Sequence, residues 1–288
     1  MKIKEFKIYS DKNILKGNHY EANSKNKKNK IILMCHGFAG VQNLFFPKYA
    51  EKFSEEGFDV ITFDYNGFGE SEGETQIIPT NQMRDISNII LYLRKNEDFK
   101  GKQLYLWGTS LGGLYVLKLA TILSGISGVY AQITFSNGIR NNTSLLDCEG
   151  KEKYLNQLEN IRYKEILENK KLLFPLKKLL SDSQSKIFLD RYKEEFSMLL
   201  STKLSLATIS DINELSIDSY LDKINVPVLL LKANNDVVNL PQEMDFIYKA
   251  LKCDKRLLEY NCGHYDVYEG DIFLASIVEQ IKWFSKEE

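Results

Sequence analysis

The chain has 288 residues, a hydrophobic fraction of 43% and a formal net charge of -1 at pH 7. This length allows one large α/β domain or two smaller ones, and the apolar content is sufficient for a core of several layers. The near-zero charge gives no reason to expect nucleic acid or an anionic membrane as a partner, and no apolar run reaches the ~18 residues of a membrane span.

The cysteines and the N-terminal segment favour an intracellular protein. Four cysteines are spread along the chain without a CxxC pair or a metal-ligand spacing, so we expect reduced thiols. Residues 1–12 alternate apolar and charged side chains, unlike a signal peptide. A cytoplasmic location is therefore expected, and nothing in the sequence requires a metal or an organic cofactor.

In chain order, the sequence first predicts a β-hairpin with strands over residues 3–9 and 13–22. From residue 30 onward, short apolar strands alternate with amphipathic helices, as in a parallel sheet buried on both faces. The predicted strands cover 30–35, 58–63, 103–107, 128–134, 228–232 and 256–260, and the predicted helices cover 45–56, 79–95, 111–123, 241–251 and 272–285. The predicted fold class is α/β, with a mostly parallel, doubly wound sheet that binds ligands at the C-terminal ends of its strands.

A long segment, residues 139–223, interrupts this alternation. It is rich in Lys, Glu and Leu, and its apolar residues recur at helical spacing at Tyr154, Leu158 and Ile161, and again at Phe188, Tyr192, Phe196 and Leu199. We interpret the segment as an inserted helical lid on a core domain formed by residues 1–138 and 224–288. An extra packing or dimerisation element is the alternative, so a homodimer is possible. Taken one by one, the apolar side chains of this segment are interpreted as the hydrophobic core of the insertion itself. The second interpretation is that they form an apolar face of the lid that contacts the substrate.

The pentapeptide GTSLG at residues 108–112 lies directly between a predicted strand and a predicted helix. In that context small residues on both sides relieve the crowding of a sharp turn, which exposes the Ser110 hydroxyl at the edge of the sheet. The turn also directs the N-terminus of the following helix toward developing negative charge. Ser110 is therefore the predicted nucleophile, with an incidental serine in a tight turn as the alternative.

The segment HGFA at residues 36–39 follows the strand over residues 30–35. A serine attack on a carbonyl group creates an oxyanion, which needs preorganised N–H donors. We expect the backbone N–H groups of Phe38 and Leu111 to supply them, because Gly37 permits a close approach of the backbone. His36 is interpreted as a structural residue rather than as the catalytic base.

One of the three histidines, His264, follows the last predicted strand, whereas His19 lies in the hairpin. His264 is the predicted general base, and Gly263 gives its loop the freedom to reach the sheet edge. Asp236, just after the strand over residues 228–232, is predicted to orient the imidazole, in the chain order Ser, Asp, His. Asp266 is the competing carboxylate, but it is poorly placed to reach the ring of a residue two positions away.

These motifs together resemble the α/β-hydrolase superfamily: HGF at 36–38, FDYNGFGES at 63–71, GTSLGG at 108–113, the late Asp236 and the GH pair at 263–264. The resemblance covers nearly the whole chain except the insertion, and it implies the roles given above for Ser110, Asp236 and His264. In FDYNGFGES, Asp64 is expected to hold a turn. The segments 131–138 and 263–280 look similar to the dienelactone-hydrolase-like and X-prolyl-peptidase-like branch.

The predicted function is hydrolysis of a small acyl or aromatic substrate through an acyl-enzyme on Ser110. An ester or thioester ranks above an amide, because it is the easier bond to cleave. Acyl transfer to an alcohol or amine would use the same residues and is the main alternative. The other alternative is a binding module without catalytic activity, because a fold alone does not establish a function. An aspartate nucleophile, as in dehalogenation, is disfavoured because Ser110 occupies the turn.

Overall fold

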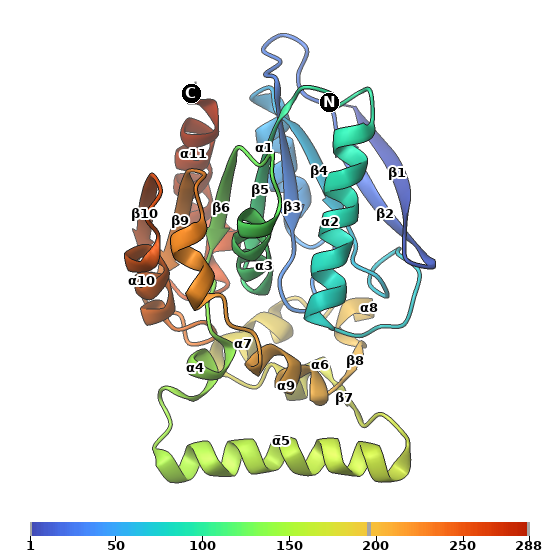
Figure 1. Ribbon diagram of the computed structural model, residues 1–288, viewed down its shortest axis with the longest axis vertical. Coiled ribbons are helices and arrows are strands. Elements are labelled where there is room, and N and C mark those ends of the chain that lie inside the picture. The colour runs from blue at the N-terminus through green and yellow to red at the C-terminus, as the bar shows by residue number, and fades with distance from the viewer. Residues whose placement is uncertain (1, 195–196, 287–288) are drawn as a thin grey trace.

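The computed structural model describes residues 2–194 and 197–286, and an eight-stranded sheet forms its centre (Figure 1). The strand order is β1-β2-β4-β3-β5-β6-β9-β10. The hairpin β1–β2 and the pair β2–β4 are antiparallel, and the other neighbouring strands of this sheet are parallel. The strands are β1 (Ile3–Ser10), β2 (Asn13–Tyr20), β3 (Lys30–Cys35), β4 (Asp59–Phe63), β5 (Gln103–Thr109), β6 (Gly128–Gln132), β9 (Val228–Ala233) and β10 (Lys255–Tyr260).

Helices cover both faces of the sheet, so alternate residues of the parallel strands enter two separate cores. The helices are α1 (Phe46–Glu55) and α11 (Gly270–Ser285) on one face, and α2 (Pro79–Lys95), α3 (Leu111–Ile122) and α10 (Pro241–Ala250) on the other. In β3, Ile31, Leu33 and Cys35 pack with α2, α3 and α10, whereas Ile32 and Met34 pack with α1 and α11. The predicted α/β fold class, with its mostly parallel and doubly wound sheet, is confirmed.

The predicted strands and helices of the core agree with the structure to within two residues at each end. β6 ends at Gln132, two residues before its predicted end. It ends there because Ile133 adopts a left-handed φ of 45°, which turns the chain out of the sheet. This turn begins the path of the chain toward the insertion.

The chain between β6 and β9 lies across the C-terminal edge of the sheet (Figure 1). Its elements are α4 (Gly138–Thr143), α5 (Cys148–Glu168), β7 (Leu173–Pro175), α6 (Leu176–Leu179), α7 (Ser183–Arg191), α8 (Ser197–Leu200), β8 (Lys203–Ser205), α9 (Ala207–Asn213) and the 3-10 turn η1 (Asp218–Lys223). The antiparallel pair β7–β8 was not predicted, because three-residue strands are too short for a periodic pattern.

The apolar residues of α5 do not form a hydrophobic core within the insertion, contrary to the interpretation of these side chains as a core of the insertion itself. Tyr154, Leu158 and Ile161 instead line a cavity between α5 and the rest of the protein. Their helical spacing places them on one face of α5, which is the face directed at the sheet edge.

The second apolar stretch packs against the core domain. The ring of Phe188 in α7 stacks on that of Tyr265, with centroids 4.1 Å apart, and Tyr192 packs against the main hydrophobic core. These contacts hold α7 beside the loop that follows β10. Phe196 and the side chain of Leu199 lie outside the described part of the chain.

A cluster of charged side chains joins both ends of the insertion to the core. Arg140 of α4 donates hydrogen bonds to Glu243 of α10, at 2.5 Å between Nε and Oε1, and to Asp218 of η1, at 2.6 Å between Nη1 and Oδ2. Glu243 also accepts the backbone N–H of Ser136 at 3.0 Å and is almost fully buried. Because Arg140 begins the insertion and Asp218 ends it, the cluster fixes the position of the insertion over the sheet edge.

Replacing Arg140 with leucine is expected to lower the free energy of unfolding by about 2–3 kcal/mol, because Glu243 would lose its charged partner while it stays buried. Urea denaturation measures the change. Arg162→Leu is the matched control, since Arg162 and Glu214 are exposed, with Nη1 and Oε1 3.7 Å apart, and loss of such a pair costs about 1 kcal/mol or less. Equal effects of the two substitutions would contradict the anchoring role.

Candidate active site

Ser110 occupies a strained turn between the end of β5 and the start of α3. Its backbone has φ 53° and ψ -124°, a conformation that L-residues rarely adopt. The neighbouring glycines make the turn possible: a Cβ on Gly108 would lie 2.4 Å from the Gly112 carbonyl oxygen, and one on Gly112 would lie 2.3 Å from that of His36. The GTSLG sequence is therefore required by the packing of this turn against the loop after β3.

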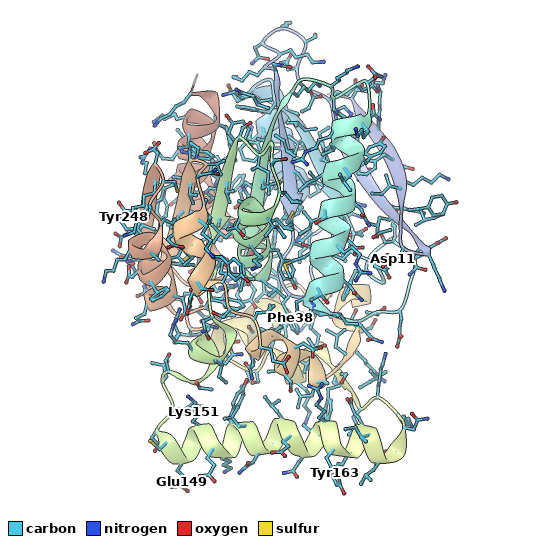
Figure 2. The ribbon with its side chains drawn as sticks, viewed as in Figure 1. Asp11, Phe38, Glu149, Lys151, Tyr163 and Tyr248 are labelled. Atoms are coloured by element: carbon cyan, nitrogen blue, oxygen red, sulfur yellow. The ribbon has the colours of Figure 1, made fainter. Side chains whose placement is uncertain are left out.

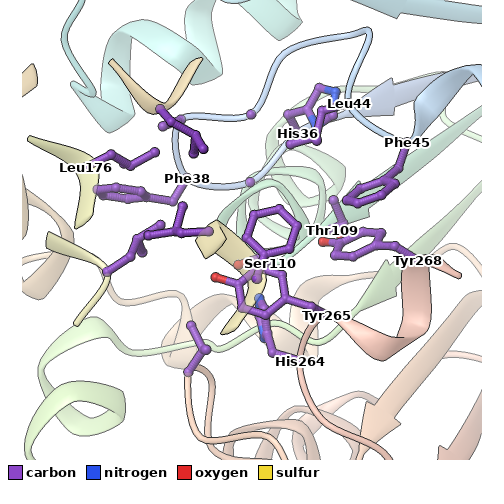
Figure 3. A pocket seen from close by; sticks show the side chains of 18 residues that line it. His36, Phe38, Leu44, Phe45, Thr109, Ser110, Leu176, His264, Tyr265 and Tyr268 are labelled. Atoms are coloured by element: carbon purple, nitrogen blue, oxygen red, sulfur yellow. The ribbon is translucent and has the colours of Figure 1, made fainter. Parts of the chain in front are cut away.

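That loop places the residues of HGFA beside the serine (Figure 3). A Cβ on Gly37 would lie 2.8 Å from the Ser110 Cβ, so only glycine permits this approach. Within the described ranges, the backbone N–H groups of Phe38 and Leu111 donate to no protein acceptor. Both N–H groups are therefore available as hydrogen-bond donors near Ser110, where the sequence predicts an oxyanion site.

The environment of His36 is structural. Its ring stacks on Phe46, with centroids 3.3 Å apart, and the residue is only 4% exposed. Burial lowers the pKa of His36 well below its usual value, so the ring stays neutral at physiological pH. This arrangement agrees with the interpretation of His36 as a packing residue.

The structure brings His264 and Asp236 into direct contact. His264 Nδ1 and Asp236 Oδ2 are 2.7 Å apart, and both side chains are almost fully buried. Asp236 Oδ1 accepts the backbone N–H groups of Val238 and Asn239, each at 2.8 Å, which fixes the plane of the carboxylate. The second oxygen is thereby directed at the imidazole.

The two other aspartates that the sequence singled out hold loops. Asp266 accepts the backbone N–H of Gly263 at 2.7 Å. Asp64 accepts the backbone N–H of Gln42 at 2.7 Å and that of Glu70 at 3.0 Å, as expected of a residue that holds a turn. Burial raises the pKa of Asp64, and the hydrogen bonds to its carboxylate oppose that change.

Sequence reasoning missed Asn239, which contacts the serine hydroxyl. Its Nδ2 lies 3.1 Å from Ser110 Oγ and 2.7 Å from the carbonyl oxygen of Ile133, and the residue is 5% exposed. Across residues 2–194 and 197–286, Ser110 and His264 form no direct hydrogen bond, so Asn239 is the partner of the hydroxyl in this state. Nothing in the sequence distinguishes it from the other asparagines of its loop, because its role depends on how the loop after β9 packs against the end of β6.

The insertion contributes Gln184 of α7 to this site. Gln184 Oε1 accepts the backbone N–H of His264 at 2.8 Å, and Gln184 Nε2 donates to the carbonyl oxygen of Asn235 at 2.6 Å. One side chain from the insertion therefore joins the two loops that carry His264 and Asp236. The sequence pattern carried no signal for this contact.

Two cavities meet at Ser110. The smaller, of about 80 Å³, is lined by residues that include Ser110, His264, Phe45 and Tyr268 (Figure 3). The larger, of about 780 Å³, extends from Ser110 to α5. Ser110 and Phe38 line both cavities, so a bound molecule can extend from the serine in two directions.

The described residues contain no group of three or more His, Cys, Asp or Glu side chains arranged to hold a metal ion. None of their helices is long and apolar enough to cross a membrane. The cytoplasmic location and the possible homodimer stay predictions.

The chain matches the family model of the alpha/beta hydrolase fold over residues 30–271, and it belongs to that family. It is 32% identical over 264 residues to an uncharacterized 31.7 kDa protein in the traX-finO intergenic region of Escherichia coli, with 91% of this chain and 92% of that protein covered. It is 24% identical over 263 residues to the quorum-quenching protein AidA of Acinetobacter baumannii, covering 89% of this chain and 86% of that one.

The fold is also similar to that of DcsB, solved in complex with its substrate analogue. The TM-score is 0.83 at 19% sequence identity, over 98% of this chain and 99% of that chain. This likeness concerns the fold. The resemblance to the dienelactone-hydrolase-like and X-prolyl-peptidase-like branch stays a prediction.

Proposed function

We propose that this protein is a serine hydrolase that cleaves an ester or thioester through an acyl-enzyme on Ser110. The observation that carries the proposal is the convergence of Ser110 with a buried His264–Asp236 pair and two available backbone N–H groups beside one pocket. These are the components of nucleophilic acyl transfer: a nucleophile, a base, a group that orients the base and an oxyanion site.

In the proposed reaction, Ser110 Oγ forms a bond to the substrate carbonyl carbon and its proton passes to His264 Nε2. Asp236 stabilises the imidazolium, and the N–H groups of Phe38 and Leu111 stabilise the oxyanion. His264 then protonates the leaving alcohol or thiol as the carbon–oxygen or carbon–sulfur bond breaks. Water, activated by His264, attacks the acyl-enzyme and releases the acid, which restores Ser110.

The first test is intact-mass spectrometry after incubation with a fluorophosphonate, run beside turnover of ester and thioester panels. A single adduct on Ser110, together with hydrolysis, is the expected result. An adduct without hydrolysis would favour the acyl-transfer alternative, because the nucleophile would then be active without water as the acceptor. No adduct on the folded protein would overturn the proposal and favour a binding module.

Asn239 is expected to assist the nucleophile by positioning its hydroxyl, because the Asn239 amide donates both to Ser110 Oγ and to the carbonyl oxygen of Ile133. Asn239→Leu should therefore slow fluorophosphonate labelling and lower kcat by about 10-fold, the effect of about 1.4 kcal/mol. Asn234→Leu is the control, since Asn234 lies in the same loop, is exposed, and its amide donates to Asn261 at 2.8 Å instead. Comparing the labelling rates with the melting temperatures separates a chemical role from a structural one: equal rates in wild type and Asn239→Leu would exclude the assisting role.

A further inference from the structure

We propose that the larger cavity binds the acyl group of the substrate and that the smaller cavity receives its leaving group. The preferred substrates are then esters or thioesters that join a long, mainly apolar acyl chain to a small alcohol or thiol. This inference rests on the proposed function of Ser110. It adds the class of substrate and the orientation of the substrate relative to Ser110 and the two cavities.

The position of His264 sets that direction. After Ser110 attacks, the carbonyl carbon carries the serine oxygen, the oxyanion, the acyl chain and the leaving group. The leaving group must point toward His264, because His264 delivers its proton. His264 lines the smaller cavity and is absent from the lining of the larger one, so the acyl chain extends the other way.

The larger cavity is suited to a long apolar chain. It has a volume of about 780 Å³ and runs from Ser110 to the inner face of α5. Its apolar walls come from the sheet edge, α5, α6 and α9, and include Phe135, Leu158, Ile161, Leu179, Ile209 and Ile212. Polar side chains also line it, among them Gln157 and Asn160 of α5, which are exposed, and Asn141 of α4, which is buried. Mainly apolar walls with a small number of polar groups are the arrangement expected of a pocket that takes apolar groups from water.

The smaller cavity has a volume of about 80 Å³, and stacked aromatic rings limit its size. Phe45 stacks on Tyr268, with centroids 5.0 Å apart, and Phe188 stacks on Tyr265 at 4.1 Å. The Tyr268 hydroxyl is also hydrogen-bonded to Thr109 Oγ1 at 2.6 Å. Because these side chains are packed against one another, the cavity cannot enlarge without breaking several contacts, and it favours a small leaving group.

Two isomeric esters test the assignment, because they have the same composition and place their long chain on opposite sides of the carbonyl. Methyl decanoate carries the chain on its acyl side, and nonyl acetate carries it on its alcohol side. The expected result is a kcat/KM at least about 10-fold higher for methyl decanoate, a difference of about 1.4 kcal/mol in transition-state binding. An equal or higher value for nonyl acetate would overturn the assignment.

A substitution in the larger cavity tests the same assignment from the protein side. Ile161→Trp narrows the cavity, so the ratio of kcat/KM for methyl decanoate to that for methyl acetate should fall at least about 10-fold. Tyr163→Trp is the matched control, because Tyr163 lies two residues away on α5, is 58% exposed and projects away from the core (Figure 2). The control should keep the wild-type ratio, and an unchanged ratio in Ile161→Trp would contradict the proposal.

Fluorophosphonate labelling separates failure of this inference from failure of the proposed function. Labelling of Ser110 without hydrolysis of either isomer would overturn the proposed substrate class, while the nucleophile itself would stand. Absence of both labelling and hydrolysis would overturn the proposed function and, with it, this inference.

Discussion

Replacing Ser110 with alanine is expected to abolish fluorophosphonate labelling and to lower kcat by about 10⁴-fold or more, while the protein stays folded. The loss should be this large because the proposed mechanism passes through a covalent bond to Ser110 Oγ. The measurement is turnover of the best ester substrate by purified protein, with a mass spectrum of the labelled wild type and variant. Substantial activity in Ser110→Ala would place the nucleophile elsewhere.

The backbone at this position supplies a control for folding. With φ 53° and ψ -124°, an alanine at residue 110 keeps the strain of the serine, whereas a glycine relieves it. Ser110→Gly should therefore melt at a higher temperature than Ser110→Ala, and both should be inactive. This order of melting temperatures would show that the turn keeps its geometry without the hydroxyl.

Replacing Asp236 with asparagine is expected to lower kcat by about 10³–10⁴-fold and to make fluorophosphonate labelling slow rather than absent. The hydrogen bonds in the site explain the size of the effect. The oxygen that accepts the N–H groups of Val238 and Asn239 must stay an oxygen, so the new amide nitrogen faces His264 Nδ1. The ring must then accept at Nδ1 and carry its proton on Nε2, which leaves no acceptor for the proton of Ser110.

Asp266→Asn is the matched control for this prediction. Asp266 accepts the backbone N–H of Gly263, a hydrogen bond that the asparagine side chain can keep through its carbonyl oxygen. The kcat of Asp266→Asn should stay within about threefold of the wild type, since a loop contact away from the imidazole ring of His264 contributes little to the chemical step. A damaging Asp266→Asn beside a harmless Asp236→Asn would reverse the assignment of the acid.

The sequence by itself determined the fold of the core and the three side chains proposed for chemistry. A strand such as β3 is apolar at every position because helices cover both faces of the sheet, and this local pattern can be read without knowing any long-range contact. The same holds for the turn at Ser110, because the glycines that it requires are immediate neighbours of the serine. His264 and Asp236 were predictable because parallel strands end at one edge of the sheet.

Only the tertiary structure decided how the site is completed. Asn239 and Gln184 contact the catalytic candidates from loops and helices whose positions depend on long-range packing, and no local pattern distinguishes them from other polar residues. The helical spacing of Leu158 and Ile161 predicts an apolar face but not what that face meets, and the structure places it over a cavity rather than in a core. A periodic sequence determines which residues share a face, whereas the arrangement of distant segments determines whether that face is filled by protein or left open for a substrate.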